Sequence, residues 1–245
     1  MSQERLQKVL AAAGIDSRRK CEELILSGAV CVNRKVVDKL PVFVDPDKDI
    51  ITVNGKKVSA ARKVHFLLNK PKGVICTNYD PQGRKRAIDI VSSRERIFCV
   101  GRLDIDTTGL IIVTNDSELA NKLTHPRYSV SKTYVAHVMG RIGAEQVEKL
   151  KKGVWLAEGK TAGSSVKILR RGREESLVEI TIRQGLNRQV RRMLAKVGLK
   201  VVSLKRTKIG RLRVTGLGVG KYRKLSGAEV VYLRNAASRL DSGRK

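Results

Sequence analysis

Aromatic residues are scarce in this chain. Tryptophan, tyrosine and phenylalanine together make up 4% of its 245 residues, although apolar residues of all kinds reach 41%. The core is therefore predicted to consist of valine, leucine, isoleucine and alanine. The length suits a small domain followed by a larger one.

Cysteine and histidine are also few, and their spacing argues against the common metal sites. The four cysteines, Cys21, Cys31, Cys76 and Cys99, form no C-x-x-C pair, and there are only three histidines. A structural zinc site needs four such ligands close together, so we expect no metal. Scattered thiols are typical of small buried residues in a reducing compartment.

Long apolar runs are absent from the sequence. None approaches the length of a membrane span. Residues 6–13 are apolar on one helical face only and are interrupted by Gln7 and Lys8, unlike a signal peptide. The sequence predicts a cytoplasmic protein that binds no membrane, and we expect a monomer.

Acidic residues are outnumbered by more than two to one. The chain has 51 Lys and Arg against 23 Asp and Glu, a formal net charge of +28. Such a surplus attracts polyanions through long-range attraction and counterion release. Since no basic amphipathic helix carries an aromatic insertion face, we predict a nucleic-acid partner and not an anionic membrane.

The first 60 residues predict a small module of two helices followed by short β elements. Apolar residues recur on one helical face over 6–13, and Ser17 can cap a second helix. Turn signals follow at Asn33-Arg34-Lys35 and Asn54-Gly55. A linker is expected at 61–64.

The second helix opens with Arg18-Arg19-Lys20. Three cations oppose the helix dipole there, and a bound phosphate would relieve the repulsion; a solvated basic face is the plain alternative. With Arg5-Leu6-x-Lys8-Val9-Leu10 and Gly28-x-Val30-x-Val32-Asn33, the segment resembles the S4 RNA-binding module. The resemblance implies contact with structured RNA through Arg5, Lys8, Ser17, Arg18, Arg19, Lys20, Asn33 and Arg34.

Residues 65–236 alternate between strand-like and helix-like segments and predict a larger α+β domain. We expect it to have a mixed, mostly antiparallel sheet and a central cleft. A basic tail, expected to be disordered, occupies 237–245. Strands are expected at 65–69, 110–114, 132–139, 166–169, 177–182 and 201–204, and helices at 116–123, 144–151 and 187–197.

The most informative segment is the polar loop Gly101-Arg102-Leu103-Asp104, which runs into the apolar strand at 110–114. A carboxylate in a loop braced by a core strand is well placed for catalysis. From spacing alone, solvation of a turn is the more common role for such residues as Asp104 and Asp106.

This loop, with Thr107, Gly109-Leu110 and Thr114-Asn115-Asp116, resembles the signature of the RsuA/RluB family of ribosomal RNA pseudouridine synthases. Ser117 stands where the family often has glycine. The family also carries an S4 module ahead of its catalytic domain. The resemblance implies isomerisation of a uridine to pseudouridine in ribosomal RNA, without metal or cofactor. Asp104 would be the nucleophile, and Asp106 is expected to matter little.

Three further segments resemble family motifs. Lys70-Pro71-Lys72-Gly73 would support the active-site loop, and Lys132-Thr133-Tyr134 would supply a tyrosine that stacks on the base. In the segment from 187 to 193, Arg191 matches the arginine that pairs with the catalytic aspartate. The preceding Gln184-Gly185-Leu186 departs from the usual Glu-Gly-Arg/Lys. The resemblance thus implies the catalytic residues Asp104, Tyr134 and Arg191, and the substrate-binding residues Lys70, Arg102, Leu204, Arg188 and Arg192.

A basic segment and two short motifs bear on the substrate. Residues 183–213 hold eleven Lys or Arg and no acid, which predicts a phosphate-binding wall. Asp80-Pro81-Gln82-Gly83-Arg84 and Glu158-Gly159-Lys160-Thr161 resemble the large-subunit branch, RluB. We therefore expect 23S ribosomal RNA, free or in an assembling subunit, more than 16S.

Two alternatives remain open at this point. A non-catalytic S4-containing protein for rRNA binding or ribosome assembly would explain the charge, but not the agreement of Asp104, Tyr134 and Arg191 with one active site. A nucleic-acid hydrolase using Asp104 and Asp106 would lack a metal cluster and a suitable histidine.

Overall fold

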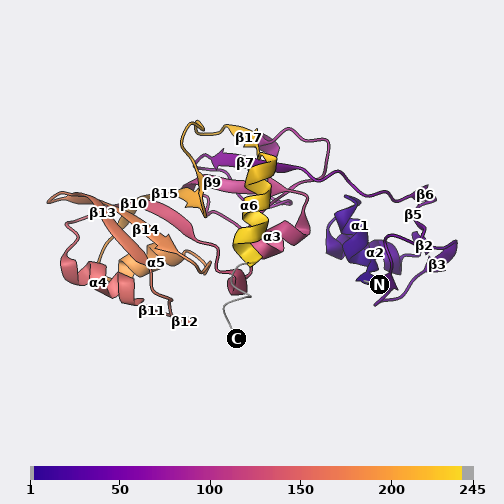
Figure 1. Ribbon diagram of the computed structural model, residues 1–245, viewed down its shortest axis with the longest axis horizontal. Coiled ribbons are helices and arrows are strands. Elements are labelled where there is room, and N and C mark those ends of the chain that lie inside the picture. Colours follow the sequence, from indigo (N-terminus) through magenta and orange to yellow (C-terminus); the bar gives the residue numbers. More distant parts are fainter. Residues whose placement is uncertain (1–2, 239–245) are drawn as a thin grey trace. The chain divides into compact units, whose positions relative to one another are not determined.

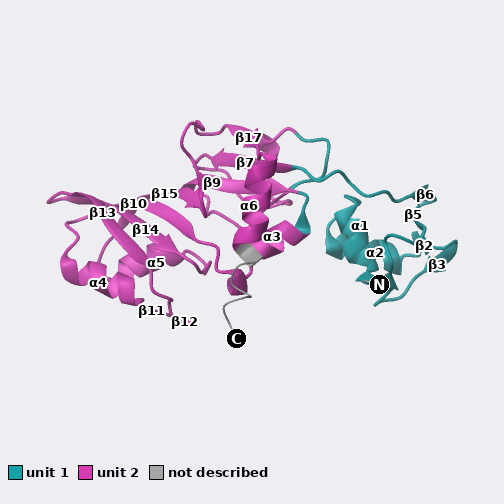
Figure 2. Ribbon diagram, in the orientation of Figure 1, with its two compact units in different colours: residues 1–64, 93–97, 115–117 teal, residues 65–92, 98–114, 118–245 magenta. Residues whose placement is uncertain are grey.

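The computed structural model describes residues 3–238 and divides into two compact units (Figure 2). Unit 1 comprises the chain through Val64 together with Ser93–Ile97 and Asn115–Ser117, and unit 2 comprises the rest. Residues up to 64, which include the predicted module and linker, thus fall in unit 1. Among residues 3–238, no helix combines the length and the apolar character needed to cross a bilayer.

Unit 1 is built of two helices and short strands, as predicted. Its elements in chain order are β1 (Glu4–Arg5), α1 (Leu6–Ala12), α2 (Arg18–Leu26), β2 (Val30–Val32), β3 (Lys35–Val37), β4 (Phe43–Val44), β5 (Ile51–Val53) and β6 (Lys56–Lys57). The strands form a four-stranded antiparallel sheet, β3-β2-β5-β6, and a separate β1-β4 pair.

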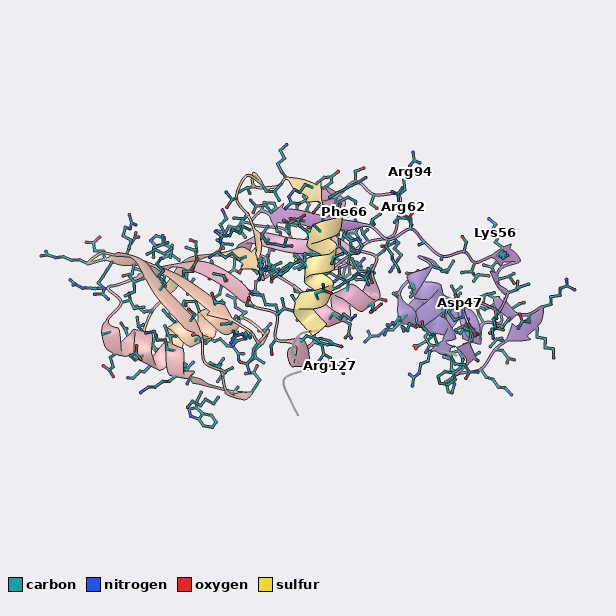
Figure 3. The ribbon with its side chains drawn as sticks, in the orientation of Figure 1. Asp47, Lys56, Arg62, Phe66, Arg94 and Arg127 are labelled. Carbon is teal, nitrogen blue, oxygen red and sulfur yellow. The ribbon has the colours of Figure 1, made fainter. Side chains whose placement is uncertain are left out.

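The local signals of unit 1 act as expected. The Ser17 hydroxyl accepts the backbone N–H of Lys20 at 3.2 Å and so caps α2. Asn33 and Arg34 both have positive φ, 50° and 68°, the geometry of a two-residue hairpin turn. The apolar helix faces pack with the sheet in one core that includes Leu6, Leu10 and Ile25. The charged side chains of Lys56 and Arg94 point outward (Figure 3).

Unit 2 is an α+β structure. Its elements in chain order are β7 (His65–Lys70), η1 (Ala87–Ile90), β8 (Phe98–Cys99), β9 (Thr107–Thr114), α3 (Ser117–Thr124, whose first residue belongs to unit 1), η2 (Pro126–Tyr128), β10 (Lys132–Met139), α4 (Ala144–Lys152), β11 (Trp155–Leu156), β12 (Gly159–Lys160), β13 (Ser165–Arg171), β14 (Glu175–Ile182), α5 (Gln189–Lys196), β15 (Val201–Ile209), β16 (Leu212–Arg213), β17 (Tyr222–Lys224) and α6 (Gly227–Ser238).

One large sheet organises unit 2 (Figure 1). Its strand order is β13-β14-β10-β15-β9-β7-β17, with β8 and β16 attached at its side. All pairs are antiparallel except β15 with β9. The mixed, mostly antiparallel sheet was therefore predicted correctly.

Two apolar cores flank different parts of this sheet. Residues of α4 and α5 pack with β10, β14 and β15 in one core that includes Leu150, Met193 and Val178. Residues of α3 and α6 pack with β7 and β9, where Leu233 joins Leu67. In the strand order, β10, β15 and β9 are consecutive, between the strands packed by the first core and those packed by the second.

Several elements differ from the sequence prediction. Strand β9 begins three residues earlier than expected, and β15 continues five residues further, to Ile209. Strand β17 and helix α6 were missed, because their polar and apolar residues show no clean period. Helix α6 runs to Ser238, so the first two residues of the predicted tail are helical, and the remainder, 239–245, lies outside the described residues.

Gly109 permits the close parallel approach of β9 to β15. It lies opposite Arg206 and has a φ of +104°. A Cβ atom there would overlap the backbone carbonyl of Arg206 and lie 2.8 Å from its nitrogen.

We expect Gly109→Ala to lower the free energy of unfolding by about 2–4 kcal/mol, measured by urea denaturation. Gly227→Ala, where a Cβ would meet nothing within 4 Å, is the matched control; an equal change in both variants would contradict this account.

Candidate active site

A cavity of about 260 Å³ opens in unit 2 beside the centre of the sheet. Its walls come from the loop before β9, from β9, β10 and β15 themselves, and from the segment between β14 and α5. Asp104, Tyr134 and Leu204, which the sequence assigned to one site, all line it. Residues separated by 100 positions in the chain thus meet in one hollow.

Backbone hydrogen bonds hold the loop that carries Asp104. The Asp104 carbonyl accepts the N–H of Thr107 at 3.0 Å, and the Ile105 carbonyl accepts the N–H of Gly73 at 2.8 Å. The N–H of Leu103 points to the sulfur of Cys76 at 3.5 Å. The turn at 70–73 therefore supports the loop, as the family motif implied, and the Asp104 side chain keeps 30% of its surface exposed.

Lys70 does not reach the cavity, contrary to its predicted substrate-binding role. Its side chain is fully buried, and its ammonium donates to the carbonyls of Val74 at 2.6 Å and Pro71 at 3.0 Å. Burial lowers the pKa of this amine. The lysine fixes the turn that supports the catalytic loop, because two carbonyls satisfy its charge inside the protein.

The cysteines are less uniform than predicted. Cys21 is buried, whereas Cys31, Cys76 and Cys99 are half-buried. A hydrogen bond with Cys99, which outweighs burial, lowers the pKa of the Cys76 thiol, and the same bond raises the pKa of Cys99. Among the described residues, no three His, Cys, Asp or Glu side chains are grouped to hold a metal ion.

The predicted pairing of Arg191 with Asp104 is wrong in this structure. The Nη2 of Arg191 lies 3.0 Å from the carboxylate of Asp106 and 3.3 Å from its carbonyl oxygen. Arg188 instead reaches both acids, at 3.5 Å from Asp104 and 3.3 Å from Asp106. Positions 188 and 191 lie about one turn apart at the start of α5, so both guanidinium groups face the same loop.

Asp106 therefore pairs with both arginines of this ionic cluster. The sequence interpretation had expected Asp106 to matter little. Burial raises the pKa of its carboxyl, but the hydrogen bond from Arg188 and the charges of Arg191 and Arg188 outweigh burial, so the pKa of Asp106 is lowered. Asp106 thus remains ionised and fixes the two arginines beside the loop of Asp104.

Tyr134 and Leu204 lie on neighbouring strands of the cavity floor. Tyr134 of β10 pairs with Arg206 of β15, and Leu204 pairs with Ala136 and, across the parallel ladder, with Thr107. Leu204 is 5% exposed. Arg102 lines the cavity and is itself exposed. These placements are compatible with contact to a substrate base.

Two cavity residues were missed by the sequence interpretation. Arg206 and Lys132 both line the cavity, and burial, followed by the charge of Arg206, lowers the pKa of Lys132 to about 8. Each lies two positions from a predicted residue, Leu204 or Tyr134. Because side chains two apart in a strand share a face, the alternation of β10 and β15 was the signal that could have found them.

The basic segment at 183–213 is only partly free to bind phosphate. Arg192, predicted to bind substrate, does not line the cavity and forms a double hydrogen bond to Glu158, at 2.9 Å for each bond. Lys208 pairs with Glu179, and Arg191 with Asp106. The exposed cations of the segment are Arg183, Arg188, Lys196, Lys200, Arg211 and Arg213.

Unit 1 exposes most of the residues predicted to bind RNA. Arg5, Arg18, Arg19, Lys20 and Arg34 are exposed. Lys8 is half-buried and pairs with Glu4 at 2.9 Å. Asn33 is also exposed, and its side chain donates to Asp49 at 2.8 Å and accepts the N–H of Ile50 at 2.9 Å.

Comparisons with known proteins find matches for both parts of the chain. Residues 64–196 match the family of RNA pseudouridylate synthases, and residues 4–50 match the S4 domain. The chain is 48% identical to the ribosomal large subunit pseudouridine synthase B of Bacillus subtilis, over 96% of this chain and 97% of that one. It is 41% identical to an uncharacterized RNA pseudouridine synthase of Aquifex aeolicus, over 96% of each.

A solved structure is similar over nearly the whole length. The crystal structure of a pseudouridylate synthase covers 94% of this chain, with 29% identity and a TM-score of 0.69. The matched family region contains Asp104, Tyr134 and Arg191. The chain therefore belongs to the RNA pseudouridylate synthase family: it is an enzyme that isomerises uridine to pseudouridine, with an S4 domain ahead of its catalytic region.

Proposed function

We propose that this enzyme isomerises a uridine of large-subunit (23S) ribosomal RNA, with Asp104 as the nucleophile. The observation that carries the assignment of Asp104 is its place in the cavity beside Tyr134 and Leu204, with Arg188 at 3.5 Å. The similarity to a large-subunit enzyme over nearly the whole chain supports the choice of RNA. Residues 1–60 would be the S4 RNA-binding domain, 61–64 the linker and 65–236 the catalytic domain.

The cavity residues suit the chemistry of this reaction. The uridine must leave its helical stack to enter, and a tyrosine ring offsets part of the lost stacking. Tyr134 would stack on the base, and Leu204 would pack against it. The Asp104 carboxylate would act on the sugar, and the Arg188 cation lies 3.5 Å from it.

The target is tested by mapping pseudouridine in both ribosomal RNAs of a strain that lacks this protein. We expect loss of pseudouridine at a position in 23S rRNA, with restoration by the wild-type gene and none by Asp104→Asn. Loss confined to 16S rRNA would overturn the choice of subunit. Incubating the purified enzyme with naked rRNA and with assembling particles would then identify the physiological form of the substrate.

The S4 module is proposed to dock the enzyme on RNA through α2. Replacing Arg18, Arg19 and Lys20 by alanine should weaken RNA binding and reduce its salt dependence by up to about 0.9 log unit per lost phosphate contact. The single-turnover rate at saturating RNA should survive, because these residues are remote in sequence from the cavity lining. Affinity is measured by filter binding at several salt concentrations.

A matched control removes the same charge elsewhere. Lys149, Lys151 and Lys152 are exposed cations of α4, and their replacement by alanine should weaken binding less. If the rate collapsed in the α2 variant while affinity held, α2 would not be a docking element.

We also propose that the enzyme is cytoplasmic and monomeric, which fractionation and light scattering would test.

A further inference from the structure

Arg206 has a buried hydrogen-bond donor with no partner among residues 3–238. The residue is 5% exposed. Its Nε donates to the Leu110 carbonyl at 2.6 Å, and its Nη1 lies 3.5 Å from the Tyr134 hydroxyl, while its Nη2 has no partner among the described residues. An unsatisfied buried donor is costly, and more so when it is charged. Such a group in a cavity wall indicates a ligand that completes it.

The surroundings of Arg206 define that ligand. It lines the cavity that holds Asp104, and it sits between Tyr134 on β10 and Gly109 on β9 in the sheet register. The hydroxyl of Thr107, another cavity residue that is 2% exposed, also lacks a hydrogen-bond partner among the described residues. The ring face of Tyr134 and the side chain of Leu204 suit a flat base, and the guanidinium suits a carbonyl oxygen at its edge.

We propose that Arg206 is a further catalytic residue, whose guanidinium binds a carbonyl oxygen of the flipped uracil and stabilises the negative charge that the base acquires when its bond to the sugar breaks. This inference rests on the proposed site around Asp104. A fixed cation aimed at the position where charge develops accelerates a reaction, because it requires no reorganisation in the transition state.

The bond changes explain why the base needs a cation. When the C1′–N1 bond breaks, its electron pair leaves with N1 and spreads onto O2 and O4 of the uracil. C1′ is compensated by an electron pair from the Asp104 carboxylate, or from the C2′–H bond with transfer of that proton to Asp104. Uracil leaves as an anion by either route. When C5 of the uracil later bonds to C1′, the bond between Asp104 and C1′ breaks on the first route, and on the second route Asp104 returns its proton to C2′. The C5 proton is then lost and N1 takes one up, so no co-reactant is needed.

The test compares Arg206→Gln and Arg206→Lys with the wild type on two RNAs, one with uridine and one with 5-fluorouridine at the target position. Fluorine withdraws electrons and stabilises the uracil anion without the protein's help. On uridine, Arg206→Gln should slow single-turnover bond cleavage by about 100-fold, and Arg206→Lys should be slowed less because it keeps the cation. On the RNA with 5-fluorouridine, Arg206→Gln should slow single-turnover bond cleavage by about tenfold or less.

Cleavage is measured as consumption of the target nucleoside after nuclease digestion and mass spectrometry, because the C5 fluorine cannot leave as a proton. Equal slowing of both variants on both RNAs would overturn the proposal and leave Arg206 as a support for β9 through Leu110. The wild-type enzyme provides the separate control: failure to convert uridine in the chosen 23S fragment refutes the proposed RNA, and the comparison is then made on the RNA that the wild type modifies.

Discussion

Asp104→Asn is expected to abolish pseudouridine formation while RNA affinity stays nearly unchanged. The loss should be at least about 10⁴-fold in the single-turnover rate, because asparagine is isosteric but is neither a nucleophile nor a base. Asp104 is partly exposed in the cavity and contacts Arg188 alone among the ion pairs of the described residues, so its replacement leaves the loop intact. Single-turnover assays and RNA binding measure the two quantities separately.

The control for charge is Glu145→Gln. Glu145 is an exposed residue of α4 that pairs with Lys149, and its change removes one negative charge as Asp104→Asn does. It should leave the rate within about twofold of the wild type. Substantial activity in Asp104→Asn would refute the assignment of the nucleophile.

The second large effect is expected at Arg191. Arg191→Lys keeps the charge but loses the forked donors that contact Asp106 through both carboxylate and carbonyl. We expect the single-turnover rate to fall about tenfold, and about 100-fold in Arg191→Ala, equivalent to roughly 1.4 and 2.8 kcal/mol of transition-state stabilisation. Affinity should fall only modestly, since ten other cations lie between 183 and 213.

Arg192 provides the control on the same helix, because it pairs with Glu158 and not with the catalytic loop. Arg192→Ala should retain most of the rate. Asp106→Asn should act in the same direction as Arg191→Ala, and the double variant should be less impaired than the sum of the two single effects, as for residues that act as a pair. Full additivity would show that the observed contact carries no coupling.

The same pair makes a pH prediction. The arginines hold the pKa of Asp106 below its usual value, so the stability that its ionised form contributes is present above the unfolded pKa and is lost as pH falls through the folded pKa. Removing Arg191 raises the pKa of Asp106. The loss of stability on acidification should therefore be smaller in Arg191→Ala and should be complete at a higher pH, because the window between the unfolded and folded pKa values of Asp106 narrows. Urea denaturation at a series of acidic pH values tests this. An unshifted profile would contradict the pair.

The sequence by itself determined the elements whose signals are local. The apolar face of α1, the Ser17 cap of α2 and the positive-φ turn at Asn33-Arg34 depend on residues a few positions apart, and so do the alternating strands β10 and β14. Separate family motifs also predicted that Asp104, Tyr134 and Leu204 share one site, and all three line the cavity.

Only the tertiary structure decided which distant side chains meet. The partner of Arg191 is Asp106 and not Asp104, because the register of β9 with β15 and the start of α5 set that geometry. Lys70 is a cationic residue of a recognised motif, yet the protein buries its ammonium against two carbonyls. Arg206 lies in the segment 203–206 that matched the family at Leu204 but was given no role, and only the pairing of β15 with both β10 and β9 brings it to the cavity wall. Local signals fix backbone conformation, whereas charge pairing depends on strand register and burial, which no short segment encodes.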